Sequence, residues 1–421
     1  MTAPSIQSIH SQTLDLPPSC VQFCPTRPGI FCIGTYLLHR REQQGDLSGG
    51  NNRDPSDTCE SEGTAANDDE ASRTEETEEE EEAVATTSTL PQKRTGSLIL
   101  FRLDEHDNSI TRLSTLPTDS AVLDLQWNCQ PNSEEILAVA TSTGRVVFYR
   151  LSATTTLEHA KTVIISEDPF VLVLSLTWHP SRHHVLGVTL SDGRVLVLHS
   201  EQHHPLWSPE APQRQHDLMK TEIHSHELEA WICAFAPLGP VDEEEGVVVV
   251  SGGDDSSLRC SRFVDRQAAA AAGVQFLWRD TRLHQAGVTS ILPLSDELVI
   301  TGSYDDHIRL LRIPSLGRRQ CLAELNLGGG VWRLKLLESS HDNNQGGSVM
   351  SAVLLASCMH AGSRIVKATR GEEDSWRLEV LARFEEHQSM NYGGDAIKRE
   401  GKNRQVVSTS FYDKLLCLWE W

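Results

Sequence analysis

The sequence has no long apolar run and no cysteine or histidine pattern typical of a metal site. None of its apolar stretches reaches the ~18 residues of a membrane-spanning helix, and no apolar core near the first residues resembles a signal peptide. The ten cysteines are scattered without a CxxC pair. We therefore expect a soluble, cytoplasmic protein with buried free thiols, no disulfides, no bound metal and no cofactor. Five cysteines fall inside apolar strands: Cys32, Cys233, Cys260, Cys321 and Cys417.

Basic residues are also scarce. The chain of 421 residues has 37 Lys and Arg against 59 Asp and Glu, a formal net charge of −22, so sequence-independent binding to nucleic acid is not expected. Common catalytic signatures are missing as well: there is no G-x-S-x-G elbow, no P-loop and no H-E-x-x-H. On motifs alone, a binding scaffold is favoured over an enzyme.

One short pattern repeats along the chain. Residues 251–259 read SGGDDSSLR and residues 301–309 read TGSYDDHIR, with fainter copies at residues 189–195 and 408–415. Each copy is a small-residue strand end, an Asp/Gly turn and a new apolar strand, which is typical of a β-hairpin. The turns recur about every 50 residues, a little more than the ~40–45 of a WD-type propeller blade.

An apolar strand precedes each hairpin and another follows it, which gives four strands per unit. The sequence therefore predicts an all-β fold, a single seven-bladed WD-type β-propeller over residues 1–421. The sequence stops after the third strand of the last unit, so we expect residues 13–16 to add the fourth strand and close the ring. A pair of β-sandwiches is the alternative fold.

The acidic charge is concentrated in one segment. Residues 60–82 contain twelve acidic residues and one basic residue, a net −11 that is half of the total. The surrounding residues 41–94 are rich in Ser, Thr, Gly, Asn and Glu, so they are predicted to be a disordered acidic insert within the first blade. A solvated loop is the simplest interpretation, and a docking segment for a basic partner is the alternative.

The hairpin turns and the loops between blades share one end of a propeller, and polar residues gather there. The acids at these turns are expected to organise the loops by accepting backbone N–H groups and pairing with a neighbouring His. This structural role is predicted for Asp255, Asp306 and Asp413, with His226 and His284 as partners.

For other residues at this end, the sequence allows either a catalytic or binding role or a structural one. His360 stands where the repeat elsewhere places an acid, so it is either a general base or part of a plain turn. Gly329 and Gly330 allow close approach of a ligand to backbone N–H groups, or form a tight turn. Trp231 and Trp332 line a pocket or pack between blades.

A series of short phrases in the second half of the chain is more specific than a generic WD repeat. In order, they are residues 229–235 (EAWICAF), 251–255 (SGGDD), 301–308 (TGSYDDHI), 329–333 (GGVWR), 358–362 (CMHAG), 392–395 (YGGD) and 410–413 (SFYD). From about His226 to Trp421 the chain resembles the WD-repeat diphthine methylesterase family. The RLKL sequence at residues 333–336 departs from the Trp-His-Pro ending common in such blades, which we expect to affect only a surface turn.

The resemblance implies an enzyme of the diphthamide pathway with translation elongation factor 2 as its partner. The family removes the methyl ester from methylated diphthine, a modified His, giving diphthine and methanol before the final amidation. Other diphthamide-pathway proteins are possible partners. Ester hydrolysis needs a base and donors for the oxyanion.

The resemblance suggests a set of catalytic residues. His360 with Asp305 or Asp395 would activate water, and the N–H groups of Gly329 and Gly330, or the hydroxyls of Tyr304 and Tyr412, would hold the oxyanion. His360, Asp395 and Tyr412 are then expected to converge with the glycine turn in a small pocket.

The same resemblance suggests how the substrate binds. The trimethylammonium group of diphthine would stack on Trp231 and Trp332. The predicted substrate-binding residues are Glu229, Trp231, Asp254, Asp255, Tyr304, Gly329, Gly330, Trp332 and Tyr392.

Two other functions are weighed against the esterase. A non-catalytic WD adaptor, such as a substrate receptor or a trafficking factor, would show a rim of apolar and basic residues. A methyltransferase is disfavoured because the sequence has no strand, Gly-rich loop and helix unit to hold S-adenosylmethionine.

Overall fold

The structure, a computed structural model, describes most of the chain outside the acidic segment. The described residues are 3–39, 91–104, 106–128, 135–200, 204–208, 218–236, 246–264, 273–295, 297–314, 317–342, 348–398 and 403–421. The described residues within 3–38 and 93–421 belong to the first of the chain's two units. Residues 41–90 of the predicted acidic insert lie outside the described residues.

The first unit is built from seven sheets, each with its strands in hydrogen-bonded order. Blade 1 consists of β3 (Pro18–Phe23), β4 (Ile30–Thr35), β6 (Arg94–Leu103) and β7 (Ile110–Thr118). Blade 2 consists of β8 (Val122–Trp127), β9 (Ile136–Thr141), β10 (Arg145–Leu151) and β11 (Leu157–Ile164). Blade 3 consists of β12 (Val173–Trp178), β13 (Val185–Leu190), β14 (Arg194–Ser200) and β15 (Leu218–Ser225). The short β5 (Leu37–Leu38) also pairs with β6.

The remaining four blades follow the same plan. Blades 4 and 5 are β16 (Ala230–Ala236), β17 (Val247–Gly253), β18 (Leu258–Val264) and β19 (Gly273–Asp280); and β20 (Val288–Pro293), β21 (Leu298–Ser303), β22 (His307–Arg312) and β23 (Gln320–Asn326). Blade 6 consists of β24 (Arg333–Asp342), β25 (Ser348–Ser357), β26 (Ser363–Arg370) and β27 (Trp376–Phe384). The first three strands of blade 7 are β28 (Asn391–Ile397), β29 (Gln405–Ser410) and β30 (Leu415–Glu420). The one described helix is a single 3-10 turn, η2 (Glu372–Asp374).

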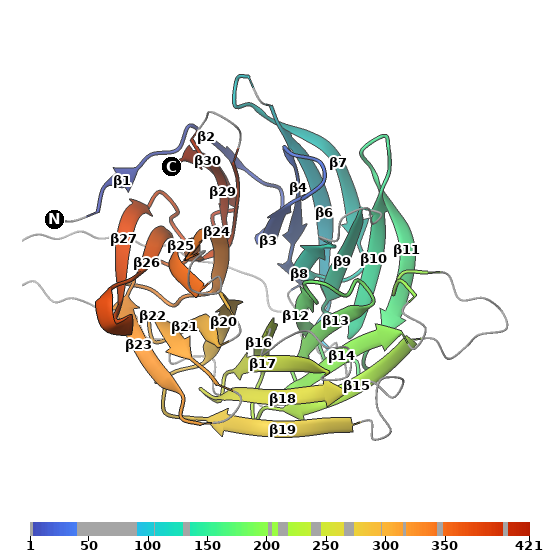
Figure 1. Ribbon diagram of the computed structural model, residues 1–421. Coiled ribbons are helices and arrows are strands. Elements are labelled where there is room, and N and C mark those ends of the chain that lie inside the picture. Colours follow the sequence, from blue (N-terminus) through green and yellow to red (C-terminus); the bar gives the residue numbers. More distant parts are fainter. Residues whose placement is uncertain are drawn as a thin grey trace, which may run out of the picture. The chain divides into compact units, whose positions relative to one another are not determined.

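The sheets are arranged in a ring, as Figure 1 shows. The first strand of each blade contacts the first strand of the next, in the order β3, β8, β12, β16, β20, β24, β28 and back to β3. The predicted seven-bladed propeller is therefore confirmed. The core lies between neighbouring blades: Ile33 of blade 1, for example, packs with Val407 and Leu418 of blade 7.

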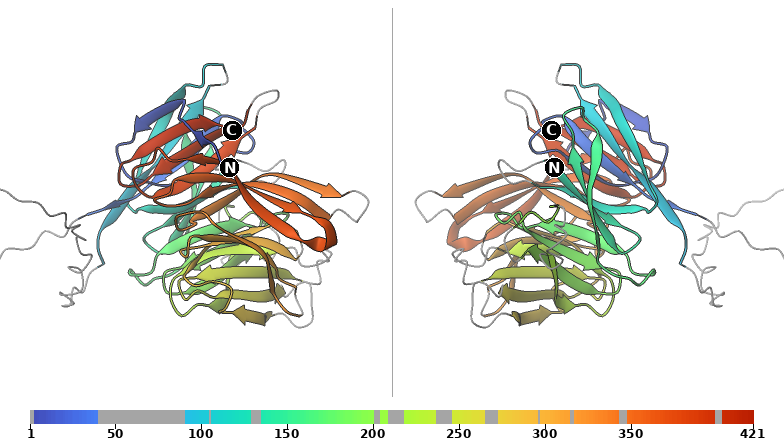
Figure 2. Two further views of the ribbon diagram at one scale, coloured as in Figure 1. Left: turned by 90° about the vertical axis from the view of Figure 1, so that its left-hand side faces the viewer. Right: turned by 90° about the vertical axis from the view of Figure 1, so that its right-hand side faces the viewer.

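The N-terminal segment closes the ring, as predicted, but slightly earlier in the chain than expected. The closing strand is β2 (His10–Thr13), which pairs antiparallel with β30, His10 opposite Leu418. A further strand that the sequence did not predict, β1 (Ser5–Ile6), adds in parallel to β27 of blade 6. Strand β2, blue in Figures 1 and 2, consequently lies side by side with the last strand β30, which is red.

The cysteine prediction is correct for four of the five strand positions. Cys32, Cys233, Cys260 and Cys417 are buried free thiols, but Cys321 is exposed on the outer strand β23. Within the described residues, no helix is long and apolar enough to cross a membrane.

Candidate active site

The inner strands share a backbone irregularity near their first residues. In blades 1, 2, 3, 4, 5 and 7 the pairing with the second strand skips the second residue of the inner strand, as in a β-bulge, which re-aims a side chain. The skipped residues are, in that order, Ser19, Leu123, Leu174, Trp231, Thr289 and Tyr392. Blade 6 has Trp332 directly before its inner strand, and the Trp332 N–H donates to the Ser357 carbonyl at 2.8 Å.

Three of these residues, Trp231, Trp332 and Tyr392, form a continuous row of aromatic rings with residues of the hairpin turns. Trp332 is its centre, with ring centroids 5.5 Å from Trp231, 6.0 Å from Tyr304 and 5.0 Å from Tyr392. The row continues from Tyr392 to Phe411 at 5.6 Å. We call the whole set the aromatic row: Trp231, Tyr304, Trp332, Tyr392, Phe411, Tyr412 and Tyr36.

Acidic groups lie beside the row at blade 4. The indole N–H of Trp231 donates to Asp254 Oδ1 at 3.0 Å, and Asp254 and Glu229 are both half-buried. Burial, and then the charge of Asp254, raises the pKa of Tyr304 well above its ordinary value. The Tyr304 hydroxyl is therefore protonated at neutral pH and able to donate. This end of the row suits a cation, through ring faces and carboxylates together.

The glycine turn packs against the turn that carries His360. A Cβ on Gly329 would lie 2.4 Å from the Cys358 carbonyl oxygen, and one on Gly330 would lie 2.8 Å from the Met359 sulfur. Only glycine fits this contact without displacing its neighbours. Within the described residues, neither Gly329 nor Gly330 donates its N–H to a hydrogen bond.

The three residues expected to converge do not do so in the described structure. His360 is exposed and makes no hydrogen bond or ion pair there. Tyr412 is 70% exposed, at the end of the aromatic row. Asp395 is buried in the central cavity, and neither His360 nor Tyr412 lines that cavity. The roles predicted for these residues stay predictions, and of the three only Asp395 lines the cavity that the described residues form.

Asp255 belongs to a buried turn network and is not available beside the rings. It accepts from His226 Nδ1 at 2.8 Å and from Ser257 Oγ at 2.7 Å, and its side chain is 4% exposed. Burial alone would raise the pKa of Asp255, but the bonds from His226 and Ser257 outweigh burial and hold it well below its ordinary value. The predicted structural role of Asp255 and His226 fits this geometry better than a role in attracting substrate.

Blades 5 and 7 contain similar turns, with one correction. In blade 5 the organising acid is Asp305, which pairs with Arg309 at 2.9 Å and accepts the Gln285 N–H. The structural role predicted for Asp306 was therefore assigned one residue too late, and Asp306 has a left-handed φ of 65°. Asp305 does not contact His360 in the described structure, which leaves the proposed acid–base pair without a geometric basis. In blade 7, Asp413 accepts from Gln388 N and Ser389 Oγ.

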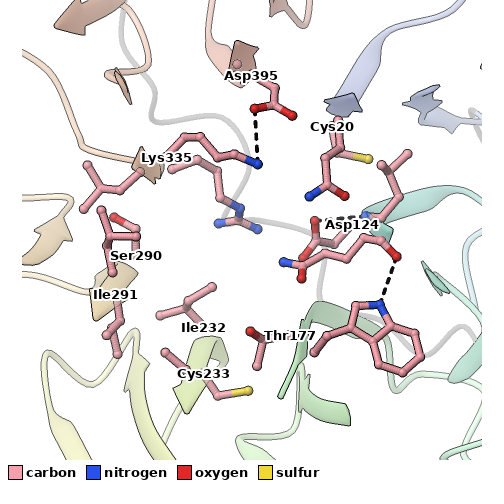
Figure 3. Close-up of a pocket in the computed structure, with 18 of the residues that line it drawn as sticks. Cys20, Asp124, Thr177, Ile232, Cys233, Ser290, Ile291, Lys335 and Asp395 are labelled. Carbon is pink, nitrogen blue, oxygen red and sulfur yellow. Dashed lines mark hydrogen bonds and ion pairs between the residues drawn. The ribbon is translucent and has the colours of Figure 1, made fainter. Parts of the chain in front are cut away.

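A cavity of about 420 Å³ lies among the inner strands of the ring, and of the aromatic row only Tyr392 lines it. Tyr392 and Asp395 line it, together with three charged residues that the sequence did not single out: Asp124, Arg333 and Lys335. In Figure 3, Lys335 extends toward the middle of the cavity, with Asp395 above it and Asp124 across from it. The expectation that the RLKL sequence affects only a surface turn is wrong, because Arg333 and Lys335 belong to the inner strand β24.

The carboxylates of the cavity differ in their partners. Asp124 accepts from Ser175 Oγ and the Leu176 N–H, both at 3.0 Å, and burial raises its pKa although Arg333 opposes the shift. Asp395 accepts the Phe23 N–H at 2.8 Å and pairs with Lys335 Nζ at 3.2 Å. Within the described residues no group of three metal-ligating side chains could hold an ion. The chemistry open to the site is cation binding, hydrogen-bond donation and acid–base catalysis.

Comparison with known proteins identifies relatives of this chain. No protein-family model matches the chain. The chain is 31% identical over 330 residues to a Schizosaccharomyces pombe protein named diphthine methyltransferase, covering 78% of this chain and 86% of that protein. A Saccharomyces cerevisiae protein of the same name is 27% identical over 373 residues, covering 77% and 88% of the two chains.

The comparison with solved structures concerns the fold alone. The crystal structure of Chaetomium thermophilum Sqt1 bound to the N-terminus of the ribosomal protein L10 superposes with a TM-score of 0.56 at 12% identity, covering 99% of this chain and 100% of that one. The WD40 propeller domain of Doa1 gives a TM-score of 0.50 at 14% identity, covering 78% and 88%.

Proposed function

This chain belongs to the diphthine methyltransferase family, and from that premise we propose that it is an enzyme of the diphthamide pathway that acts on translation elongation factor 2. The pathway assignment comes from the names of relatives matched over more than four-fifths of their length. Other proteins of the pathway are further candidate partners. The expected cytoplasmic location stays a prediction.

The reaction that we propose is hydrolysis of the methyl ester of methylated diphthine, giving diphthine and methanol. Water adds to the ester carbonyl carbon, the bond to the methoxy oxygen breaks, and methanol leaves with a proton. A methyl transfer from S-adenosylmethionine is disfavoured on the fold, because the described residues form strands and one 3-10 turn, without a helix to follow a Gly-rich loop.

The observation that carries the proposal is the aromatic row, which adjoins the cavity through Tyr392 and through Arg333, stacked on Trp332. The rings of Trp231, Tyr304 and Trp332 lie within 5.5–6.2 Å of one another, and Asp254 is bonded to the first of them. Aromatic faces with a nearby carboxylate are how proteins bind quaternary ammonium groups. The trimethylammonium group of diphthine is a ligand of that kind, and its carboxyl end would then reach the polar cavity.

The catalytic residues are proposed less specifically. Asp395 is the predicted acid that lines the cavity, whereas His360 and Asp305 lie elsewhere at this end of the ring. The hydroxyl of Tyr304 and the N–H groups of Gly329 and Gly330 are donors near the row, and Tyr412 lies at its far end. His360 stays a candidate base only if its exposed turn moves toward the bound ester.

The test uses purified protein and elongation factor 2 that carries methylated diphthine, with no cofactor added. We expect methanol release and a mass loss of one CH₂ per modified factor. The His360→Ala and Asp395→Ala proteins identify the residues: full activity in His360→Ala would end its assignment as the base. No methanol, with binding to the factor intact, would overturn the esterase and return the chain to the non-catalytic adaptor.

A further inference from the structure

The cavity contains positive charge in a chain that is strongly negative overall. The formal net charge is −22, yet Arg333 and Lys335 both line the cavity. Alternate residues of a strand point to one face, so these two side chains of β24 share the face that looks onto the ring axis. Two cations beside a site for a quaternary ammonium need an explanation, because they repel positive charge, whereas they stabilise negative charge that a ligand carries or that forms on it during a reaction.

Arg333 is already engaged by the protein. Its guanidinium lies 4.8 Å from the centre of the Trp332 ring and donates to the carbonyls of Thr289 and Trp332 at 3.2 and 3.0 Å. These contacts fix Arg333 between the aromatic row and the cavity. Its charge faces Asp124, whose carboxylate it stabilises against the cost of burial.

Lys335 is held by one partner and otherwise open to the cavity. Its Nζ lies 3.2 Å from Asp395 Oδ1, and its side chain is 40% exposed whereas that of Asp395 is 3% exposed. Asp395 is fixed in turn by the N–H groups of Phe23 and Ala396, each at 2.8 Å. A lysine ammonium has three N–H donors, and Lys335 makes no other hydrogen bond or ion pair among the described residues. Donors therefore remain for a ligand.

We propose that Lys335, positioned by Asp395, is the anion-binding group of the cavity, and that it takes the carboxyl oxygens of a ligand whose trimethylammonium group lies on the aromatic row. The cavity then recognises a trimethylammonium carboxylate as one unit, with the cation on the rings and the carboxyl group on Lys335. This inference rests on the proposed function and names the residue that stabilises the negative charge formed in the reaction.

In the reaction, Lys335 meets charge as it develops. When water adds to the ester carbonyl carbon, negative charge forms on the carbonyl oxygen, and a preorganised ammonium donor stabilises it. After the bond to the methoxy oxygen breaks and methanol leaves with a proton, the product carboxylate stays paired with Lys335. Asp395 is then a positioning residue that acts through Lys335.

The first experiment is a binding measurement that needs no elongation factor. Glycine betaine carries a trimethylammonium group and a carboxylate, and its amide carries the same cation without the negative charge. Titrated into the purified full chain and followed by ligand NMR, glycine betaine is expected to bind about tenfold more tightly than the amide, the ratio for one charge-assisted hydrogen bond. Equal affinity of the wild type for both ligands would overturn the inference without any variant.

The variants locate the effect. Lys335→Met is expected to lose the preference for the carboxylate while still binding the amide. Lys398→Met is the matched control, since Lys398 pairs with Glu338 at 3.6 Å on the exposed surface and is 62% exposed; it is expected to keep the preference. A Lys335→Met protein that keeps the preference contradicts the inference.

Esterase kinetics provide a second, independent test of the inference. Asp395→Asn should lower kcat more than it raises KM, a split that a merely structural defect would not produce. Esterase activity without a carboxylate preference overturns the role of Lys335 and leaves the proposed function standing. A carboxylate preference without esterase activity supports the binding site and overturns the esterase.

Discussion

Blades 2 and 4 fold the start of their inner strands in the same way and present different side chains there. The skipped residue is Leu123 in blade 2 and Trp231 in blade 4. Blades 3 and 7 repeat the contrast with Leu174 and Tyr392. The backbone irregularity is thus shared by six of the seven blades, and the residue at the skipped position decides that blades 4 and 7 contribute a ring there whereas blades 2 and 3 do not. A propeller acquires a site at one sector without any change of fold.

The largest expected effect comes from removing the centre of the row. Trp332→Ala should lower kcat/KM by about 30-fold, since a desolvated cation on an aromatic face is worth about 2 kcal/mol. The matched control is Leu123→Ala, which truncates the equivalent position in blade 2 and should leave kcat/KM unchanged. If both variants lose activity equally, the contrast between the two sectors has no functional meaning.

A second prediction concerns the buried histidines of the turns. His284, 4% exposed, bonds to Thr301 Oγ1 through Nε2 at 2.8 Å, and burial, then Arg309, lowers its pKa to about 4. Because the unfolded chain takes up the proton near pH 6.5, stability should fall as the pH drops from there toward 4, by about 2 kcal/mol at pH 5.

The substitution His284→Gln keeps a donor for Thr301 and removes the titration. Its free energy of unfolding, measured with urea at several pH values, should depend less on pH than that of the wild type. If the free energy of unfolding of His284→Gln depends on pH as strongly as that of the wild type, burial of His284 does not contribute to the pH dependence, and the prediction is wrong.

A smaller effect is expected at the acid beside the rings. Asp254→Asn keeps an oxygen for the Trp231 N–H and removes the charge, so KM should rise about threefold to tenfold at low salt and less at high salt. Asp192→Asn, in the turn of blade 3 away from the row, is the control and should change neither value. A salt-independent change would point to lost geometry instead of lost charge.

The smallest effect is expected at the end of the row. Tyr412 is 70% exposed, and among the described residues its hydroxyl makes no hydrogen bond and its ring lies 5.1 Å from that of Phe411, so Tyr412→Phe should change kcat/KM by at most about twofold. A loss of a hundredfold or more would instead support the oxyanion role first predicted for its hydroxyl.

The fold could be predicted from the sequence because it depends on local signals that recur. Hairpin turns at residues 254–255 and 305–306, and apolar strands at a regular spacing, specify blades without knowledge of long-range contacts. The boundaries of the N-terminal strands are predicted less well than the blades: the closing strand β2 begins at His10 and not at residue 13. Strand β1 has no periodic signal because it consists of Ser5–Ile6 alone.

The site could be predicted only in part. Trp231 and Trp332 were recognised as possible pocket residues, because their phrases are specific and bulky rings are rare in this chain. The sequence does not indicate the pair formed by Lys335 and Asp395, since 60 residues separate them and their contact depends on the packing of the neighbouring inner strands β24 and β28. Nothing in the pattern of either blade alone indicates it.

The central claim is that the aromatic row binds the trimethylammonium group, and NMR saturation transfer tests it most directly. Saturating the aromatic protons of the protein should transfer magnetisation to the N-methyl signal of a peptide that carries diphthine. The account predicts transfer with the wild type and with Leu123→Ala, and its loss with Trp332→Ala. Transfer of equal strength with Trp332→Ala, or none with the wild type at concentrations where the peptide binds, would contradict it.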